Sequence, residues 1–479
     1  MNSLLRGLCI GTAGALAAAC AVGPDYHRPP FAATDVYKES ADWKPSEPND
    51  VLSRGPWWKI FHDDALDALE VQIDISNQNV KAAEAAFEQS RALVAQARAG
   101  FWPTIAATLG VQRQNAPTVV TNAVGIPTSV SSNTQTSVTA GVSGNWDIDI
   151  WGRIRRTTES NVASAEANSA ALAAARLSAQ AELATDYFEL RAQDQLEKLL
   201  DDTVDAETLS LHITESRYKF GVAARADVVT AETQLLSSQA QQVNAKIQRA
   251  ILEHAVAVLV GKQPAEFSLS ASSMRTDVPT VPAGVPSTLL ERRPDVAEAE
   301  RKMAAANAQI GVAKAGYFPD LTLTGQDQYS GTTFSHLIQN ANRVWAIGPQ
   351  LAQTMFDGGL VRAEVRGARA AYEGTVDAYR ETVLTSFQQV EDQIVTLRVL
   401  EEEGVIEDKT VKAAREAETL TLNQYKAGTV PYSSVITAQT VRLSAEETAL
   451  QVLSSRLQAS VALVEALGGG WDASMATAK

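Results

Sequence analysis

The sequence predicts a mainly α-helical fold that carries a β-barrel part and is built by internal duplication. Three observations predict it: one unit occurs twice at a constant spacing, two uncharged hairpin segments alternate in polarity, and two helical segments are very long. Hydrophobic residues make up 45% of the 479 residues and charged residues 20%, which is typical of globular chains. This composition excludes a protein of many membrane-spanning helices, because each such helix needs a long apolar run.

The N-terminus has the features of a secretory signal. Arg6 provides a positive charge, and Leu8–Ala19 is an apolar stretch too short to span a bilayer. The small residues before Cys20 resemble a lipobox, in which the cysteine is lipidated and becomes the new N-terminus. We therefore expect residues 1–19 to be a signal peptide and Cys20 to carry a lipid, of which each buried methylene contributes about 0.8 kcal/mol to membrane attachment. A plain signal peptide cut nearby is the alternative.

One unit of the chain is repeated. Tyr218-Lys219-Phe220-Gly221 matches Tyr425-Lys426-Ala427-Gly428, and the same spacing continues without a gap until Gly261 falls on Gly468. We expect a first repeat over 63–277 and a second over 278–467, preceded by an N-terminal segment over 20–62 and followed by a tail over 468–479. Each repeat is predicted to hold, in order, a helical segment (63–99; 294–315), a β-hairpin (104–149; 320–356), a long helix (152–219; 359–426) and a shorter helix (226–260; 433–467).

The hairpins alternate between apolar and polar residues, as a strand with one apolar face does. No Lys, Arg, Asp or Glu occurs between Arg113 and Asp147 or between Asp327 and Arg343, and aromatic residues lie near the base of each hairpin. Uncharged alternating strands with aromatic girdles are typical of a transmembrane β-barrel. Four strands cannot close a barrel, and open edges are not tolerated in lipid, so several chains must contribute strands; three would give twelve. A soluble sandwich would show the same alternation.

The long helical segments set the dimensions of the rest. About 68 residues at 1.5 Å per residue give roughly 100 Å of helix, and two shorter helices of about 35 residues would match one long helix end to end. Small residues with Leu at intervals near three, four and seven suit coiled-coil packing. Read without the hairpins, the same segments would indicate an ordinary coiled coil, as in a soluble periplasmic adaptor or scaffold.

Pro and Gly mark where the segments change type. Pro103 and Pro319 lie where helix gives way to strand, because a helix usually ends just before Pro. Gly152, Gly358 and Gly359 lie where strand gives way to helix, and Gly accepts the dihedral angles that such a switch needs.

Several motifs resemble one family. Glu291–Val296, Ala308–Gly311 and Phe318-Pro319, together with Asp149–Arg153 and Phe356–Gly359, are similar to the signatures of the TolC-like outer-membrane efflux family. Cys20–Tyr26 resembles the mature start of its lipoprotein branch, which serves resistance–nodulation–division (RND) pumps, and Ala21 suits the outer membrane.

The resemblance implies a homotrimer in the outer membrane, lipid-anchored and extending into the periplasm. Its twelve-stranded β-barrel would continue into a twelve-helix periplasmic α-barrel, with an equatorial collar for which 20–62, 264–290 and the tail are our candidates. A periplasmic adaptor and an inner-membrane RND transporter would complete a tripartite pump, in which this chain passively conducts drugs or other small molecules outward. Type I protein secretion and metal-ion efflux are the alternatives, because the transporter selects the cargo.

The resemblance also places the periplasmic tips, which contact the adaptor and form the gate, at the turns around Gly221 and Gly428. Relatives often have Asp residues just after the second turn, whereas this chain has Val430, Ser434 and Thr437. An acidic ring is therefore not expected there.

The first copy keeps Arg225 and Asp227 after its turn. We expect a tight tip held by Tyr425, Arg225 and Asp227, with weaker selectivity for cations.

Other functions lack support in the sequence. The net charge of −15 argues against nucleic acid as a partner, because phosphate binding needs Lys and Arg. The excess acidic residues form either a solubilising surface or an acidic lumen that favours cations. The five His are far apart, and Cys9 and Cys20 form neither a disulfide framework nor a metal motif. We expect no enzyme activity, no metal and no cofactor apart from the lipid on Cys20.

Overall fold

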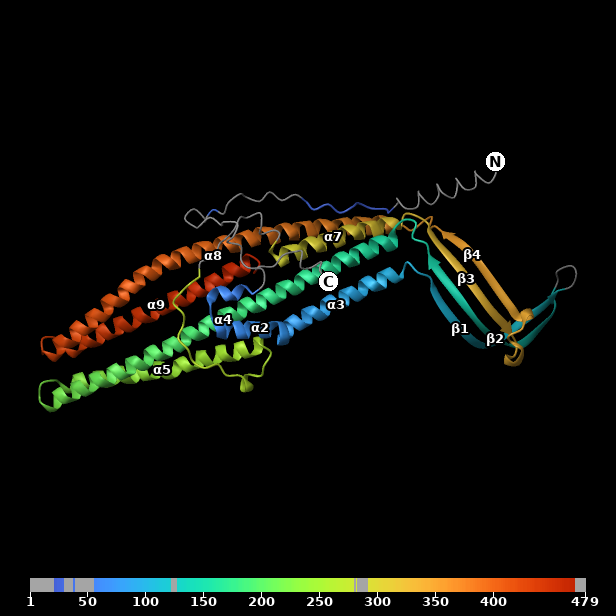
Figure 1. The fold of residues 1–479 in the computed structure, drawn as a ribbon. Coiled ribbons are helices and arrows are strands. Elements are labelled where there is room, and N and C mark those ends of the chain that lie inside the picture. The colour runs from blue at the N-terminus through green and yellow to red at the C-terminus, as the bar shows by residue number, and fades with distance from the viewer. Residues whose placement is uncertain are drawn as a thin grey trace. The chain divides into compact units, whose positions relative to one another are not determined.

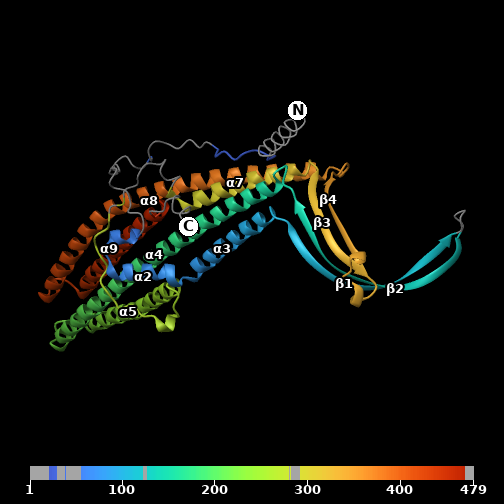
Figure 2. The same cartoon turned by 45° about the vertical axis from the view of Figure 1, so that its right-hand side comes forward.

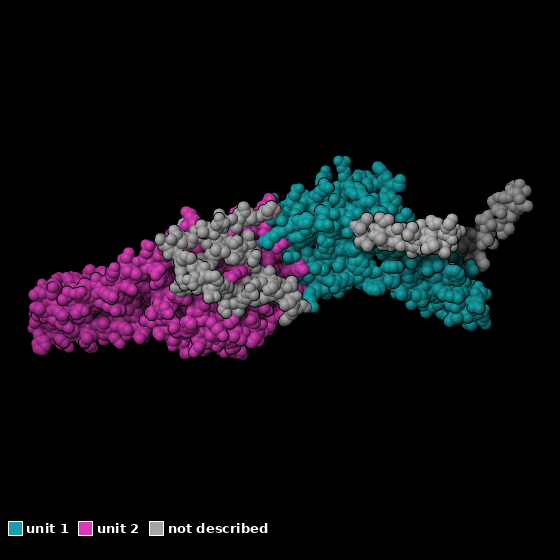
Figure 3. Space-filling model, turned by 45° about the horizontal axis from the view of Figure 1, so that its top comes forward, with its two compact units in different colours: residues 1–29, 88–165, 301–377 teal, residues 30–87, 166–300, 378–479 magenta. Residues whose placement is uncertain are grey.

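The computed structural model describes residues 21–29, 38, 56–121, 127–279, 281 and 292–469, with residues 116–121 and 127–133 described by their backbone alone. The predicted signal peptide, Cys20 and the tail from residue 470 lie outside the described residues, as do parts of the three candidate collar segments. The chain forms two compact units (Figure 3), each made of three stretches of sequence. Unit 1 comprises residues 1–29, 88–165 and 301–377, and unit 2 comprises residues 30–87, 166–300 and 378–479.

Unit 1 contains the predicted four-stranded sheet (Figure 1). The strands are β1 (Thr104–Thr121), β2 (Pro127–Asp147), β3 (Asp320–Gly331) and β4 (Arg343–Ala352), in the order β1-β2-β3-β4 with every pair antiparallel. The hairpin of the first repeat is much longer than that of the second, and β4 ends four residues before the predicted boundary at 356. Since β1 and β4 are the outer strands of the described sheet, each has one edge without a neighbouring strand.

One face of this sheet carries apolar side chains that remain exposed in the single chain. Ile105 and Leu109 of β1 are 72% and 70% exposed, and Ile347 of β4 is 70% exposed. A soluble sheet would bury this face against another layer. Two open edges and an exposed apolar face fit strands that meet lipid and the strands of other copies of the chain.

The helices repeat the two-copy pattern of the sequence. Both long helices have 67 residues and both helices that follow them have 35, so a long helix has a length of roughly 100 Å at 1.5 Å per residue. The helices are α2 (Asp64–Ser76), α3 (Gln78–Ala99), α4 (Arg153–Lys219), α5 (Arg225–Leu259), α7 (Pro294–Ala315), α8 (Leu360–Lys426) and α9 (Tyr432–Ala466). No described helix combines the length and apolar character that crossing a membrane would require.

The helical segment predicted over 63–99 consists of two helices, α2 and α3. Asn77 lies between them, and its side-chain oxygen accepts a hydrogen bond from the backbone N–H of Val80 at 3.1 Å, which caps α3. Its side-chain amide donates to the carbonyl of Leu259 at 2.8 Å. This tie to the end of α5 is a tertiary contact, so the helical pattern of the sequence did not reveal the break.

The main hydrophobic core lies in unit 2, where α2 and the preceding 3₁₀ turn (Trp57–Phe61) pack against α4 and α9. Trp57 and Phe61 are almost fully buried, and the Phe61 ring lies 4.9 Å from that of Phe188 on α4. The hydroxyl of Tyr187 donates to the carboxylate of Asp63 at 2.9 Å, so the start of α2 is fixed to the middle of α4. This core anchors the long helices and leaves their far ends to be held by other contacts.

Candidate functional site

The ends of the long helices in unit 2 form two turns with the same backbone geometry. Gly221 follows α4 and Gly428 follows α8, with φ angles of +73° and +76°, a region that favours glycine. The N–H of Val222 donates to the carbonyl of Arg217 at 2.8 Å, and the N–H of Thr429 donates to the carbonyl of Gln424 at 3.0 Å. Both turns thus end a helix with the hydrogen bonding of a glycine C-cap.

The two turns differ in what surrounds them. Tyr425 is 3% exposed, whereas its counterpart Tyr218 is 44% exposed. A side chain built on Gly221 would meet open space, whereas one on Gly428 would lie 3.6 Å from an Nη atom of Arg217. The α8–α9 turn is therefore held against α4, and the α4–α5 turn is free on that side.

Four residues hold the two helix pairs together at this end; we call Thr214, Arg217, Tyr425 and Lys426 the tip latch. Arg217 donates from Nη1 to the backbone carbonyl of Lys426 at 2.8 Å, and its guanidinium lies 4.8 Å from the centre of the Tyr425 ring. The Tyr425 hydroxyl donates to Thr214 Oγ1 at 3.4 Å. A cation over an aromatic face and two hydrogen bonds thus join α4 to α8.

A small apolar cluster supports the latch from α9. Tyr432 packs beside Tyr425 with ring centres 5.1 Å apart, and both rings belong to a buried cluster with Ala231 and Val435. Burial raises the pKa of Tyr432 to about 12, and the nearby carboxylate of Glu207 contributes. The phenol therefore stays neutral, and the cluster stays apolar, throughout the physiological pH range.

Beyond the latch, α4 also meets α9 through polar side chains, beside a small apolar cluster that includes Leu200 of α4 and Leu443 of α9. Gln439 donates to Ser210 Oγ at 3.2 Å, and Arg442 donates to Thr203 Oγ1 at 3.2 Å. Arg442 is also paired with Glu418 of α8 at 2.6 Å. Three of these side chains, Thr203, Ser210 and Gln439, are at most 3% exposed, so this polar seam is shielded from water in the structure.

The other sequence-predicted tip residues lie close by but make different contacts. The Arg225 guanidinium lies 6.0 Å from the ring centre of Tyr218 and does not reach the latch residues. Asp227 accepts from the backbone N–H of Ala224 at 3.3 Å, so it caps α5. Ser434 is half-buried, and exposed Thr437 donates to a carbonyl of its own helix at 3.0 Å.

Sequence reasoning missed Arg217, Thr214 and Tyr432. A signal for two of them exists in the repeat: Arg217 corresponds to Gln424, and Arg225 corresponds to Tyr432. At both places the duplicated unit replaces a charged residue by an uncharged one, and both Arg217 and Tyr432 contact Tyr425.

The strand–helix switches of unit 1 are built alike in the two repeats. Gly152 has a φ of +81°, and Gly358 and Gly359 have φ of +64° and +91°. Carboxylates cap the helices that follow: Asp149 accepts from two N–H groups at the start of α4, and Asp357 accepts from two at the start of α8.

The proline-containing switches lie beside them. Pro103 and Pro319 precede β1 and β3 directly, and the carbonyl of Pro319 accepts from Trp151 Nε1 at 2.9 Å. The Trp151 ring also stacks on Phe318 at 4.5 Å. The end of one repeat's hairpin is thereby locked to the start of the other's.

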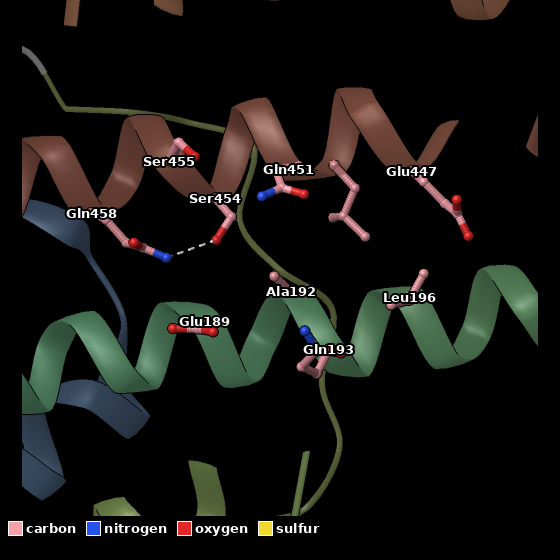
Figure 4. Close-up of a pocket in the computed structure, with 10 residues that line it drawn as sticks. Glu189, Ala192, Gln193, Leu196, Glu447, Gln451, Ser454, Ser455 and Gln458 are labelled. Atoms are coloured by element: carbon pink, nitrogen blue, oxygen red, sulfur yellow. Dashed lines mark hydrogen bonds between the residues drawn. The ribbon is translucent and has the colours of Figure 1, made fainter. Parts of the chain in front are cut away.

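A cavity of about 350 Å³ lies between α4 and α9 in unit 2 (Figure 4). Glu189 of α4 lies opposite Ser454 and Gln458 of α9, and Gln193 lies opposite Gln451. Gln458 donates to Ser454 Oγ at 3.1 Å. The second view (Figure 2) shows the same two helices running side by side. The lining is mixed, because Ala192, Leu196 and Leu450 lie among the polar side chains. Within the described ranges no three His, Cys, Asp or Glu side chains are grouped to hold a metal ion.

The chain is similar to known proteins over most of its length. The sequence model of a family described as Outer membrane efflux protein matches residues 71–262 and 285–469. The probable efflux pump outer membrane protein TtgC of Pseudomonas putida is 28% identical over 94% of this chain and 93% of its own length. The pyoverdine export outer membrane protein OpmQ of the same species is 30% identical over 88% of this chain and 89% of its own.

Solved structures give the same picture. The outer-membrane channel OprN superposes with a TM-score of 0.86 at 30% identity, covering 94% of this chain and all of that one. The open state of the Neisseria gonorrhoeae MtrE outer membrane channel gives a TM-score of 0.81 at 25% identity, covering 94% of this chain and 98% of that one.

Proposed function

Because the chain belongs to the outer membrane efflux protein family, we propose that it is the outer-membrane exit channel of a tripartite efflux pump. The observation that carries this proposal is the four-stranded sheet with two unpaired edges, continued in the same chain by two 67-residue helices. Three copies close the sheets into a twelve-stranded barrel in the outer membrane, which satisfies the edge strands that lipid cannot. The helices form the periplasmic conduit, and an adaptor and an RND transporter complete the pump.

The tip latch is the resting gate of this channel. The side chains predicted to replace an acidic ring are neutral, so we assign closure to the contacts of Arg217 with Tyr425 and Lys426. Adaptor binding at the two glycine turns separates α8 and α9 from α4, and the polar seam lets them part because its hydroxyl and amide groups can hydrogen-bond to water instead. Conduction is passive, and the relatives' names, which include pyoverdine export and antibiotic efflux, favour small molecules as the cargo.

Cys20 is the lipid anchor of the channel. The segment that follows it packs within unit 1. The Val22 N–H donates to the carbonyl of Trp151 at 3.0 Å. The side-chain amide of Asn307 donates to the carbonyl of Pro24 at 3.0 Å. Asp25 pairs with the buried guanidinium of Arg156 at 2.8 Å. These contacts support an anchor held beside the strand–helix switch of the same protomer, at the level where the barrel meets the periplasm.

Deleting the gene that encodes this chain tests the proposed function. Cells that lack it but keep the adaptor and transporter are expected to accumulate a fluorescent efflux substrate severalfold above the parent level, and restoring the chain is expected to reverse this. A Cys20→Ala variant is expected to leave less protein in the outer-membrane fraction. Unchanged accumulation in the deletion strain, with the transporter confirmed to be active through another duct, would contradict the assignment to that pump.

A further inference from the structure

Unit 1 contains a second cavity, of about 550 Å³, whose wall carries an unusual concentration of positive charge. Lys314 at the end of α7 and Arg362, Arg366 and Arg369 at the start of α8 line it. The two helices are in contact there, because a side chain built on Gly316 would lie 3.4 Å from Val361. We call this cavity, with its four cations, the basic pocket.

The three arginines are placed to act together. Their spacing of four and three residues puts them on one face of α8, while Glu364 lies two residues from Arg362 and Arg366, on a different face, and does not line the cavity. Among the described residues, none of the four cations of the basic pocket has a hydrogen bond or an ion pair to a protein group.

The first repeat has arginines at the corresponding helix start, and all of them are neutralised. Arg153 lies 3.7 Å from Asp147, and Arg155 lies 3.4 Å from Asp149. Arg156 is bound by the carboxylates of both Asp25 and Glu159, each at 2.8 Å. The second repeat therefore leaves uncompensated the charge that the first repeat neutralises, although the whole chain is acidic with a net charge of −15.

The rest of the pocket is apolar or aromatic. Tyr317 is 51% exposed, Phe318 stacks on Trp151, and Val365 forms a buried part of the wall. Val22 completes the lining only two residues after Cys20. Aromatic rings beside cations are the arrangement found where a protein meets lipid headgroups.

We propose that the basic pocket binds the phosphate headgroup of an anionic phospholipid in the periplasmic leaflet of the outer membrane. Arginine matches phosphate oxygens with paired N–H groups, and the apolar and aromatic wall suits the adjoining glycerol and acyl carbons. The inference rests on the proposed function, which sets the strand–helix switches at the membrane edge. The bound lipid would lie beside the lipid on Cys20, so each protomer would hold one covalent and one non-covalent lipid at the same level.

Native mass spectrometry of the full-length trimer in mild detergent tests the proposal. Phosphatidylglycerol, added stepwise, is expected to bind at one site per protomer and more tightly than zwitterionic phosphatidylcholine. At about fivefold per arginine, the triple variant Arg362→Gln, Arg366→Gln, Arg369→Gln is expected to bind phosphatidylglycerol on the order of 100-fold more weakly. The variant with Lys at all three positions keeps the charge and is expected to retain most of the binding.

A matched control removes three exposed cations from unit 2 by the changes Lys246→Gln, Lys409→Gln and Lys412→Gln, and it is expected to bind like the parent. An equal loss in this control would overturn the proposal in favour of general surface charge. If inorganic phosphate displaces the lipid when its concentration only equals that of the lipid, the lipid assignment is overturned and the pocket is a free-phosphate site. Because the spectrum also reports the mass of the assembly, a trimer without lipid preference contradicts this inference alone, whereas the lack of a trimer contradicts the proposed function.

Discussion

Replacing Arg217 by Ala is expected to raise the fraction of time that the purified channel spends open in a planar bilayer. The change removes the cation over Tyr425 and the hydrogen bond to the Lys426 carbonyl, which together stabilise the closed tip by about 2 kcal/mol. In a two-state gate this loss shifts the ratio of closed to open channels about 30-fold towards the open state. The measurement is the fraction of time spent in the high-conductance level.

Two further variants separate the latch from a general loss of stability. Gln424→Ala changes the residue that corresponds to Arg217 in the second repeat and is expected to gate like the parent. Tyr425→Phe keeps the ring but loses the long hydrogen bond to Thr214, so its effect is expected to be small. An Arg217→Ala channel that assembles as a trimer and still gates like the parent would show that closure depends on other contacts.

Replacing Gly428 by Val is expected to abolish efflux while the channel still reaches the outer membrane. A β-branched residue at a φ of +76° is strained by about 1–2 kcal/mol. Its side chain would also contact Arg217, which lies 3.6 Å from the position of a Cβ atom. The deformed turn no longer fits the adaptor. We expect at least a tenfold fall in the adaptor that co-purifies with the channel, together with dye accumulation close to that of the deletion strain.

Gly221 provides the matched comparison for this variant. Gly221→Val imposes the same backbone strain at a φ of +73°, but its side chain would point into open space. It is therefore expected to lose less adaptor binding than Gly428→Val. Gly428→Asn, which tolerates the left-handed region, is expected to keep part of the activity. Normal efflux by Gly428→Val would mean that the α8–α9 turn does not transmit adaptor binding.

The elements of the fold were largely predictable because each has a local signature. Strand alternation and the absence of charge marked the four strands, and the repeated Tyr-Lys-x-Gly motif placed both turns. The break between α2 and α3 was not predictable, because Asn77 is fixed by a carbonyl of α5 that is distant in sequence.

The tip illustrates the same limit at the candidate site. Tyr218 and Tyr425 occupy equivalent positions in the two repeats, yet only Tyr425 is buried. Arg217 from the other repeat lies over its ring, and Tyr432 packs beside it. The sequence predicted a tip held by Tyr425, Arg225 and Asp227. In the structure Tyr425 contacts Arg217, whereas Arg225 and Asp227 contact Tyr218 and the backbone of Ala224. Contacts between repeats depend on how the helices pack, which periodicity within one helix does not reveal.

The basic pocket shows that the spacing of charged residues does not reveal whether they are paired with opposite charges. The helical spacing of Arg362, Arg366 and Arg369 is visible in the sequence, but whether carboxylates neutralise such residues is not. Arg156 of the first repeat is paired with Asp25, 131 residues away. Only the fold reveals that, among the described residues, Arg362, Arg366 and Arg369 have no such partner.

The central claim is that three chains form one channel in the outer membrane, and the mass of the native particle tests it most directly. Protein extracted from outer membranes in mild detergent is expected to have a protein mass close to three times the 51.2 kDa of one chain, less the signal peptide, because four strands per chain need three chains to close a barrel. A monomer or dimer recovered from the soluble periplasmic fraction would contradict the account and favour a soluble coiled-coil scaffold.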